Sequence, residues 1–200
     1  MAIKSSDRQW GSLARSFHWL MALLIIINGT VGLYMTGMNP SMDKISIYAI
    51  HKSIGLTVLA LVLLRLSWRW FDPRPRDLPM PRWQKLAAHA VHGALYLLML
   101  AIPLSGWLFN SAKGNPLQWF KLFNLPGLVA KDKALADLFH QTHEWLFWIL
   151  VLVLIAHVGG ALMHHFVERD NTLRRMLPFS RWLGNDLHPA KPSSTDRPPS

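Results

Sequence analysis

Two histidines bracket an apolar stretch of the chain, and each could ligate a metal. His143 and His157 enclose the sequence HEWLFWILVLVLIAH, in which Glu144 is the only charged residue between them. An α-helix turns about 100° and rises about 1.5 Å per residue, so fourteen residues return the second imidazole to within roughly 40° of the first, about 21 Å along the axis. Histidine is costly inside a membrane and is usually functional there. The spacing therefore predicts one ligand for each of two metal centres, stacked in a hydrocarbon core about 30 Å thick.

The composition indicates a membrane protein and limits the kind of metal centre. Of the 200 residues, 51% are hydrophobic and ten are tryptophans. The chain contains no cysteine, which excludes disulfides, iron–sulfur clusters, thiolate zinc sites and covalently attached haem. Histidine is left as the strong ligand for iron, and any haem must be b-type. The formal net charge of +10 is interpreted first as a topology signal, and we do not expect nucleic-acid binding.

Four apolar segments have the length needed to cross a bilayer, about 20 residues. Fifteen of the 21 lysines and arginines lie before the first segment, between the second and third, or after the fourth. This excess of positive charge predicts that both termini are cytoplasmic. The predicted fold is an all-α, integral membrane four-helix bundle over residues 1–178, with a disordered cytoplasmic tail at 179–200. The spans are expected at about 17–36, 45–64, 86–109 and 143–165.

The connection between the third and fourth spans is more apolar than a solvated loop. Residues 110–140 are predicted to be periplasmic and contain the sequence PLQWFKLFNLPGLV. We expect this stretch to lie along the membrane surface.

The predicted topology gives each of four histidines a depth in the membrane. His18 and His51 lie near the cytoplasmic end of the first span and the periplasmic end of the second, and His143 and His157 lie near the periplasmic and cytoplasmic ends of the fourth. Matching depths pairs His18 with His157 and His51 with His143, which predicts two haem b sites inside the bundle. Two axial imidazoles leave no open position on the iron, so such haems would transfer electrons. The alternative is that these histidines only anchor helix ends in the head-group region.

Three further histidines share the cytoplasmic depth. His89 and His92 lie near the start of the third span and are competitors for the cytoplasmic iron. His164 lies seven residues after His157, within about 20° of its face and about 10 Å nearer the cytoplasm. This position predicts that His164 lies at the edge of the inner haem.

Other residues on the same helical faces are positioned to contact two haem macrocycles. Each of them also has an ordinary structural explanation. Arg65 lies fourteen residues after His51 and could pair with a haem propionate, or it could extend to the membrane interface. Gly29 and Gly32 lie on the face of His18, where missing side chains either make room for a macrocycle or allow tight helix packing.

Several motifs of the chain resemble the bacterial cytochrome b561 family. They are RSFHW at 15–19, HKSIG at 51–55, LRLSWR at 64–69, the KGNP of the outer loop and HHFVERDNTLRRMLP at 164–178. The resemblance covers about residues 8–178 and includes loop motifs as well as hydropathy. It implies that His18 and His157 ligate one haem b, and that His51 and His143 ligate the other. The chain has histidine at all four positions.

The resemblance also implies an activity, that of a superoxide:ubiquinone oxidoreductase in the bacterial inner membrane. Superoxide would be oxidised to O2 at the periplasmic side, and ubiquinone would be reduced to ubiquinol. The lysines that could attract superoxide include Lys52 and Lys113. The residues that could bind quinone on the cytoplasmic side are His164, His89, His92 and Arg82. The alternative function is a haem-b anchor that relays electrons between a dehydrogenase or hydrogenase partner subunit and the quinone pool.

Overall fold

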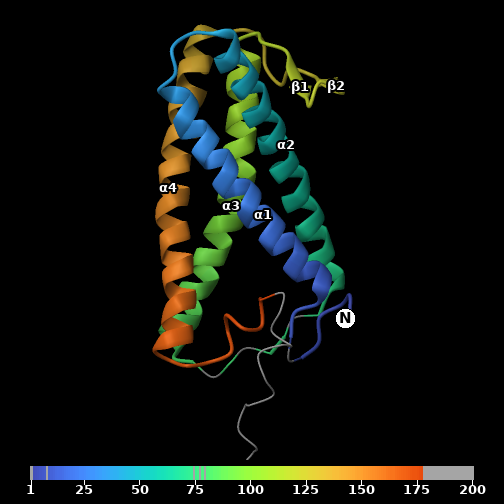
Figure 1. Ribbon diagram of the computed structural model, residues 1–200, viewed down its shortest axis with the longest axis vertical. Coiled ribbons are helices and arrows are strands. Elements are labelled where there is room, and N and C mark those ends of the chain that lie inside the picture. The colour runs from blue at the N-terminus through green and yellow to red at the C-terminus, as the bar shows by residue number, and fades with distance from the viewer. Residues whose placement is uncertain (1, 8, 74, 77, 79, 178–200) are drawn as a thin grey trace, which may run out of the picture.

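The computed structural model of the chain is a bundle of four long helices with a small β-hairpin at one end (Figure 1). The structure describes residues 2–7, 9–73, 75–76, 78 and 80–177, and the predicted tail at 179–200 lies outside the described residues. The elements are α1 (Ser12–Thr36), α2 (Met42–Phe71), α3 (Arg82–Ala112), β1 (Leu117–Trp119), β2 (Phe123–Leu125) and α4 (Lys133–Phe166). Within the described residues, four helices are long and apolar enough to cross a membrane. The predicted four-helix membrane bundle is therefore confirmed.

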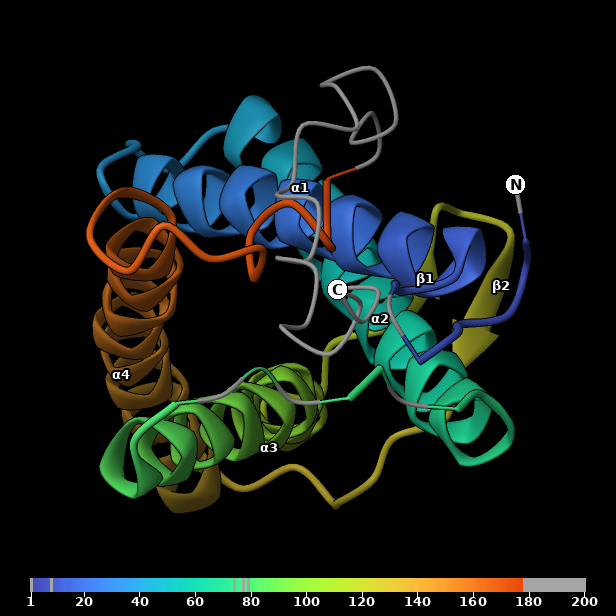
Figure 2. The ribbon, with the colours of Figure 1, turned by 90° about the horizontal axis from the view of Figure 1, so that it is seen from below.

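The helices run alternately up and down, so that α1 and α3 begin where α2 and α4 finish (Figure 1). We call this end of the bundle the N-terminal end, and the opposite end, which carries β1 and β2, the hairpin end. Helix α1 packs on α2, α2 on α3, and α3 on α4, whereas the backbones of α1 and α4 approach each other less closely. Seen along the bundle, the four helices surround a central region (Figure 2).

Helices α2 and α4 begin before the predicted spans, and a side chain caps the first turn of each. The Ser41 hydroxyl accepts a hydrogen bond from the Lys44 backbone N–H at 3.1 Å at the start of α2. The Asp132 carboxylate accepts one from the Leu135 N–H at 2.9 Å, which starts α4 ten residues before the predicted span at 143–165. Such side-chain acceptors satisfy N–H groups that a first helical turn leaves unpaired.

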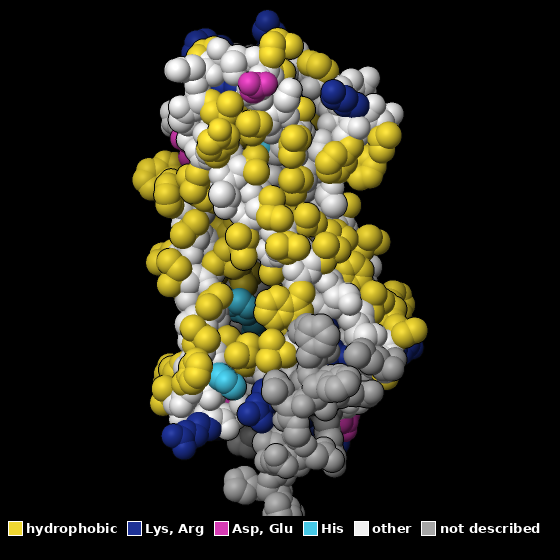
Figure 3. Space-filling model, in the orientation of Figure 1, with side chains coloured by type: hydrophobic (Ala, Val, Ile, Leu, Met, Phe, Trp, Pro, Cys, Tyr) yellow, Lys and Arg dark blue, Asp and Glu magenta, His cyan; other side chains and the backbone are white. Residues whose placement is uncertain are grey.

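One cluster of buried apolar side chains lies among three of the helices. It consists of Met21 from α1, Leu59 and Val62 from α2, and Met99 from α3, whereas the buried Ala136 and Leu150 of α4 lie outside it. Most apolar side chains face outward, and hydrophobic residues cover the face shown in Figure 3 between Lys and Arg side chains at its two ends. This distribution is expected for a protein whose surroundings are lipid. The same face has a recess in its lower half, and a histidine side chain is visible inside it (Figure 3).

The connection between α3 and α4, which the sequence predicts only as an apolar stretch along the membrane surface, forms an antiparallel hairpin. Its turn places Phe120 and Lys121 at φ values of 45° and 62°. The hairpin packs on α2, since Trp119 Nε1 donates to Thr57 Oγ1 at 3.0 Å and the Phe120 N–H donates to Ser53 Oγ at 3.0 Å. Strands of three residues are too short to show the alternation of apolar and polar residues that marks a strand in a sequence.

Candidate metal centres

At the hairpin end, His51 of α2 faces His143 of α4. The centroids of the two imidazole rings are 6.1 Å apart, and the ring planes are 80° from each other. Two imidazoles that ligate one metal have centroids about 6 Å apart, because each metal–nitrogen bond is about 2 Å long and each centroid lies about 1 Å behind its nitrogen. The separation of His51 and His143 therefore suits a single metal between the rings.

The outward-facing nitrogens of both rings contact backbone carbonyls. His51 Nδ1 lies 3.2 Å from the carbonyl oxygen of Asn28 on α1. His143 Nδ1 lies 3.0 Å from the carbonyl oxygen of Ile102 on α3, and it is also 3.0 Å from Ser105 Oγ. A carbonyl can only accept, so Nδ1 of each ring carries the proton and Nε2 keeps its lone pair. Metal-ligating histidines are commonly oriented by this arrangement, and the residues at this end fit a haem iron.

Glycines allow the two rings to approach the neighbouring helices. A Cβ at Gly32 of α1 would lie 3.1 Å from His51 Cε1, and a Cβ at Gly106 of α3 would lie 3.2 Å from His143 Cε1. A Cβ at Gly29 would instead lie 3.2 Å from Phe147 Cε2. The space left by Gly29 and Gly32 is thus taken by aromatic rings of α4 and α2. The matching role of Gly106 was not recognised in the sequence.

At the N-terminal end, His18 of α1 faces His157 of α4 with the same separation. Their ring centroids are 6.1 Å apart, with ring planes at 60°. His92 of α3 lies close to this pair, with its centroid 5.3 Å from that of His157. The structure therefore brings together both predicted pairs and also the predicted competitor. The ring separation of His18 and His157 thus also suits a metal between them.

Two arginines lie close to the N-terminal pair. Arg65 Nη2 lies 3.5 Å from His18 Nδ1, where the hairpin end has a carbonyl. The guanidinium groups of Arg65 and Arg69 lie 5.7 Å and 5.4 Å from the ring centroid of Tyr96, and Arg69 Nη1 donates to the Tyr96 hydroxyl at 3.2 Å. Tyr96 was not recognised in the sequence, although it lies four residues after His92 on the same face of α3.

The other predicted quinone-site residues lie near the N-terminal end but do not converge. Arg82 and His89 are exposed in the first turns of α3, and Arg82 has no hydrogen bond or ion pair within the described part of the chain. His164, near the end of α4, contacts Asp170 with its Nδ1 at 2.7 Å from Oδ2. Burial acts to raise the pKa of Asp170, but hydrogen bonds from Thr172 and from His164 outweigh it and hold this pKa below its usual value.

Residues 167–177, which we call the strap, run under the bundle from the end of α4 toward the start of α1 (Figure 1). Trp19 Nε1 donates to the Met176 carbonyl at 2.8 Å, and Arg15 Nη1 donates to the Leu177 carbonyl at 3.1 Å. The strap thus ties the end of α4 to the start of α1. It coincides with most of the HHFVERDNTLRRMLP motif.

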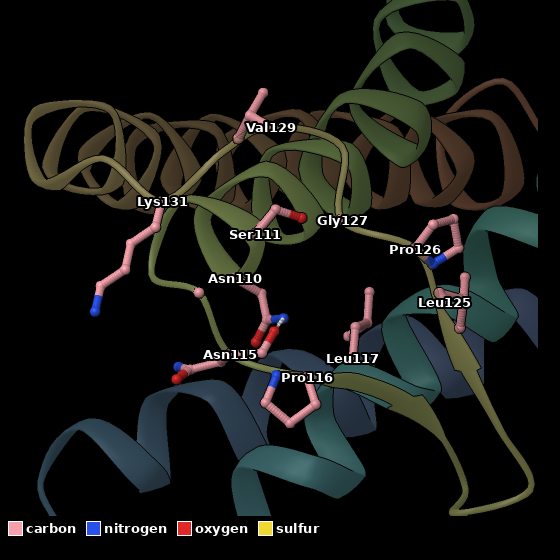
Figure 4. Close-up of a pocket in the computed structure, with 11 residues that line it drawn as sticks. Asn110, Ser111, Asn115, Pro116, Leu117, Leu125, Pro126, Gly127, Val129 and Lys131 are labelled. Carbon is pink, nitrogen blue, oxygen red and sulfur yellow. Dashed lines mark hydrogen bonds between the residues drawn. The ribbon is translucent and has the colours of Figure 1, made fainter.

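The predicted superoxide-attracting lysines both lie at the hairpin end. Lys52 is half-buried and donates from Nζ to Asn110 Oδ1 at 3.1 Å. Lys113 is exposed, and its Nζ lies 4.9 Å from the ring centroid of Phe109. Asn110 also lines a pocket of about 430 Å³ between the end of α3 and the hairpin, in which Lys131 extends outward at one edge (Figure 4). The contact between Asn110 and Lys52 joins this pocket to the residue that follows His51.

Four spanning helices that hold two facing imidazole pairs, in a chain without cysteine, define a membrane protein of the cytochrome b class. The model of one family, described as prokaryotic cytochrome b561, matches residues 9–179. The chain belongs to this family, and the resemblance of its motifs is confirmed. It is thereby a multi-pass bacterial membrane protein that transfers electrons with b-type haem.

Individual relatives are similar over most of their length. Cytochrome b561 homolog 2 of Escherichia coli (strain K12) is 36% identical over 186 residues, which cover 88% of this chain and 95% of that protein. Cytochrome b561 homolog 1 of the same strain is 32% identical over 166 residues, with coverage of 80% and 92%. A protein of Yersinia pestis named probable superoxide oxidase CybB is 31% identical over 175 residues, with coverage of 87% and 98%.

Proposed function

We propose that each histidine pair holds one haem b: His18 and His157 would hold the iron of one, and His51 and His143 would hold the iron of the other. The observation that carries this proposal is the 6.1 Å separation of the ring centroids in both pairs. A haem bound in this way supplies one-electron oxidation and reduction, without an open position on the iron. Because both pairs include a residue of α4, the fourteen-residue spacing on that helix sets them about 21 Å apart along it.

We further propose that the protein is a superoxide:ubiquinone oxidoreductase. Each superoxide anion loses one electron and becomes O2, and ubiquinone takes up two electrons and two protons to become ubiquinol. Two superoxide anions therefore balance one ubiquinone. The support is membership of an electron-transfer family and 31% identity to a protein named as a probable superoxide oxidase.

In this proposal the N-terminal end faces the cytoplasm and the hairpin end faces the periplasm, in the bacterial inner membrane. The support is the charge distribution, since fifteen of the 21 lysines and arginines belong to the segments at the N-terminal end or to the tail that follows them. Positive residues favour the cytoplasmic side of a bacterial membrane.

Lys52 is the better placed of the two candidate lysines for attracting superoxide. Its ammonium group is held by Asn110 at 3.1 Å in a half-buried position, beside His51 in the chain. Lys113 is exposed, so water and salt screen its charge more strongly. A fixed cation near an apolar wall raises the local concentration of a small anion.

His92 is the best placed of the candidate quinone-site residues. Its ring centroid lies 5.3 Å from that of His157, at the proposed cytoplasmic haem. His89 lies one turn earlier on α3 and Arg82 two turns before that, and both are exposed, so they connect this position to water as a source of protons. His164 is engaged by Asp170 and would bind a quinone only after breaking that contact.

Stopped-flow mixing of the oxidised, purified protein with superoxide tests this function directly. We expect the haem absorption bands to show reduction, followed by reoxidation when ubiquinone is added. Superoxide dismutase in the same mixture should abolish the reduction. If superoxide reduces nothing while a chemical reductant does, the oxidoreductase proposal is wrong. A soluble subunit that co-purifies and reduces the haems would then favour the relay function.

A further inference from the structure

Two buried hydrogen-bond donors at the N-terminal end have no acceptor within the described part of the chain. Arg15 Nε and Trp68 Nε1 are both buried and lack a partner among the described residues. Arg15 is a charged residue with only 9% of its surface exposed, although its Nη1 donates to Leu177 of the strap. Leaving a buried donor unpaired is unfavourable, and leaving a buried charge unpaired is more so. These donors therefore indicate that an acceptor belongs at this place.

The sequence positions of the two donors place both on the N-terminal side of a contact between α1 and α2. In this contact His18 Nδ1 and Arg65 Nη2 lie 3.5 Å apart across the antiparallel helices. Arg15 lies three residues before His18, and Trp68 lies three residues after Arg65. Arg15 thus lies about 4.5 Å nearer the N-terminal end than His18, and Trp68 lies about 4.5 Å nearer it than Arg65. Each residue stays near the helical face of the one that it is compared with. One acceptor below His18 could serve both donors.

The missing acceptor must also carry negative charge. Neither Arg15 nor the neighbouring Arg65 and Arg69 forms an ion pair with a carboxylate within the described part of the chain. Asp72 is a buried carboxylate one turn beyond Trp68, and it accepts hydrogen bonds from Ser5 at 2.7 Å and 2.6 Å but none from Arg15 Nε or Trp68 Nε1. A water molecule would satisfy a donor but would not balance the charge.

We propose that Arg15 and Trp68 bind a propionate carboxylate of the haem that His18 and His157 ligate. This inference rests on the proposed haem site. A carboxylate accepts several hydrogen bonds, carries a full negative charge and matches the planar guanidinium of arginine. A quinone carbonyl is neutral and would leave Arg15 unbalanced. A lipid phosphate would have to displace the strap, whose Leu177 carbonyl lies on Arg15.

Redox titration of the purified protein, with the two haems followed optically, measures this contact without an activity assay. A cation beside a propionate favours the reduced haem, which carries one positive charge less. We expect Arg15→Gln to lower the reduction equilibrium constant of one haem about tenfold, or about 59 mV for one electron. Arg15→Lys, which keeps the charge, should recover part of the loss. Trp68→Phe should lower the constant about threefold.

Infrared difference spectra of protein carrying haem with ¹³C-labelled propionates identify the acceptor. We expect an isotope-sensitive carboxylate band that shifts in Arg15→Gln and in Trp68→Phe. Trp70→Phe is the matched control, since Trp70 is on the same helix and 89% exposed. Trp19→Phe removes a strap contact without touching either donor. Both controls should leave the potentials and the band unchanged.

The outcomes separate this inference from the proposed haem sites. Two haems per chain with unchanged potentials and an unshifted band in both variants would overturn the propionate contact alone. A Trp19→Phe variant that reproduces the effect of Arg15→Gln would overturn it too, because a loosened strap would then explain the result. Wild-type protein without two haems b would instead refute the proposed function.

Discussion

The two histidine pairs have the same ring separation but opposite surroundings. At the hairpin end, both Nδ1 atoms face backbone carbonyls, those of Asn28 and Ile102. At the N-terminal end, His18 Nδ1 faces the guanidinium of Arg65, and His157 has a third histidine beside it. One pair is therefore held by hydrogen-bond acceptors and the other lies among cations.

This difference predicts the direction of electron transfer between the two haems. A carbonyl that accepts from Nδ1 makes the imidazole a more basic ligand, which stabilises oxidised iron. Nearby cations stabilise reduced iron, because reduction removes positive charge. The haem at the N-terminal end should thus have the higher reduction potential, and electrons should move toward it from the hairpin end. The environment of the ligands, rather than the ligands themselves, would set this direction.

Removing a single histidine ligand should produce the largest effect, because each such variant should lose one of the two haems. We expect His143→Ala and His157→Ala each to retain one haem b per chain in a pyridine haemochrome assay, because a single imidazole holds haem poorly. His140→Ala is the matched control, since His140 lies on the same helix but is exposed and pairs with Glu144 at 3.5 Å. A full complement of two haems in His157→Ala would show that His92 is the true ligand.

Replacing the arginine beside His18 should reduce the difference between the two haems. We expect Arg65→Gln to lower the reduction equilibrium constant of the N-terminal haem by about tenfold, or about 59 mV, and to leave the other haem unchanged. Redox titration of the variant measures both values. Arg76→Gln, which removes an exposed arginine paired with Asp7, is the control. Equal reduction potentials of the two haems in the wild-type protein would contradict the predicted difference between the two ends.

The positions of the four histidines could be predicted because helical geometry and hydropathy determine them. The period of a helix gives the face of each residue, and the order of spans gives its depth, so the pairs that the structure brings together follow from spacing. Haem ligation by these pairs stays a prediction. His92 was a competitor on the same grounds, and its place beside His157 keeps it one.

The partners of the histidines could not be predicted in the same way. The carbonyls of Asn28 and Ile102 belong to the backbone, so no residue type marks them. Gly106 became recognisable only once the ring of His143 was seen against it. Arg15 and Trp68 are ordinary interfacial residues in the sequence, and they are distinguished only by the buried atoms Arg15 Nε and Trp68 Nε1, which have no partner among the described residues. Contacts between helices depend on how each helix is rotated about its axis and shifted along it. The periodicity of the sequence determines neither.

Weakening the contacts of His143 Nδ1 should give a smaller change at the hairpin end. Ser105 is buried, and its Oγ lies 3.0 Å from Nδ1 while it donates to the Ile102 carbonyl at 2.8 Å. We expect Ser105→Ala to raise the reduction equilibrium constant of this haem about twofold, because Ile102 still accepts from the ring. Ser111→Ala, farther along α3, is a control. A lowered potential would contradict the proposed influence of the acceptors.

Acidification should loosen the strap at the N-terminal end and leave the hairpin end unchanged. We expect this effect to be smaller than those of the substitutions above. Since the pKa of Asp170 is held below its usual value, this carboxylate stabilises the docked strap above its unfolded pKa of about 3.9, and the contribution is lost as the pH falls through the lower, folded value. We expect cleavage within the strap by an acid-tolerant protease to increase below about pH 4. Asp170→Asn should be cleaved more readily at neutral pH and should lose most of this pH dependence. The spectrum of the hairpin-end haem should stay constant over the same range, because the strap contacts α1 and the end of α4. If both haems change together, the acid response belongs to the whole bundle and the two ends are not independent.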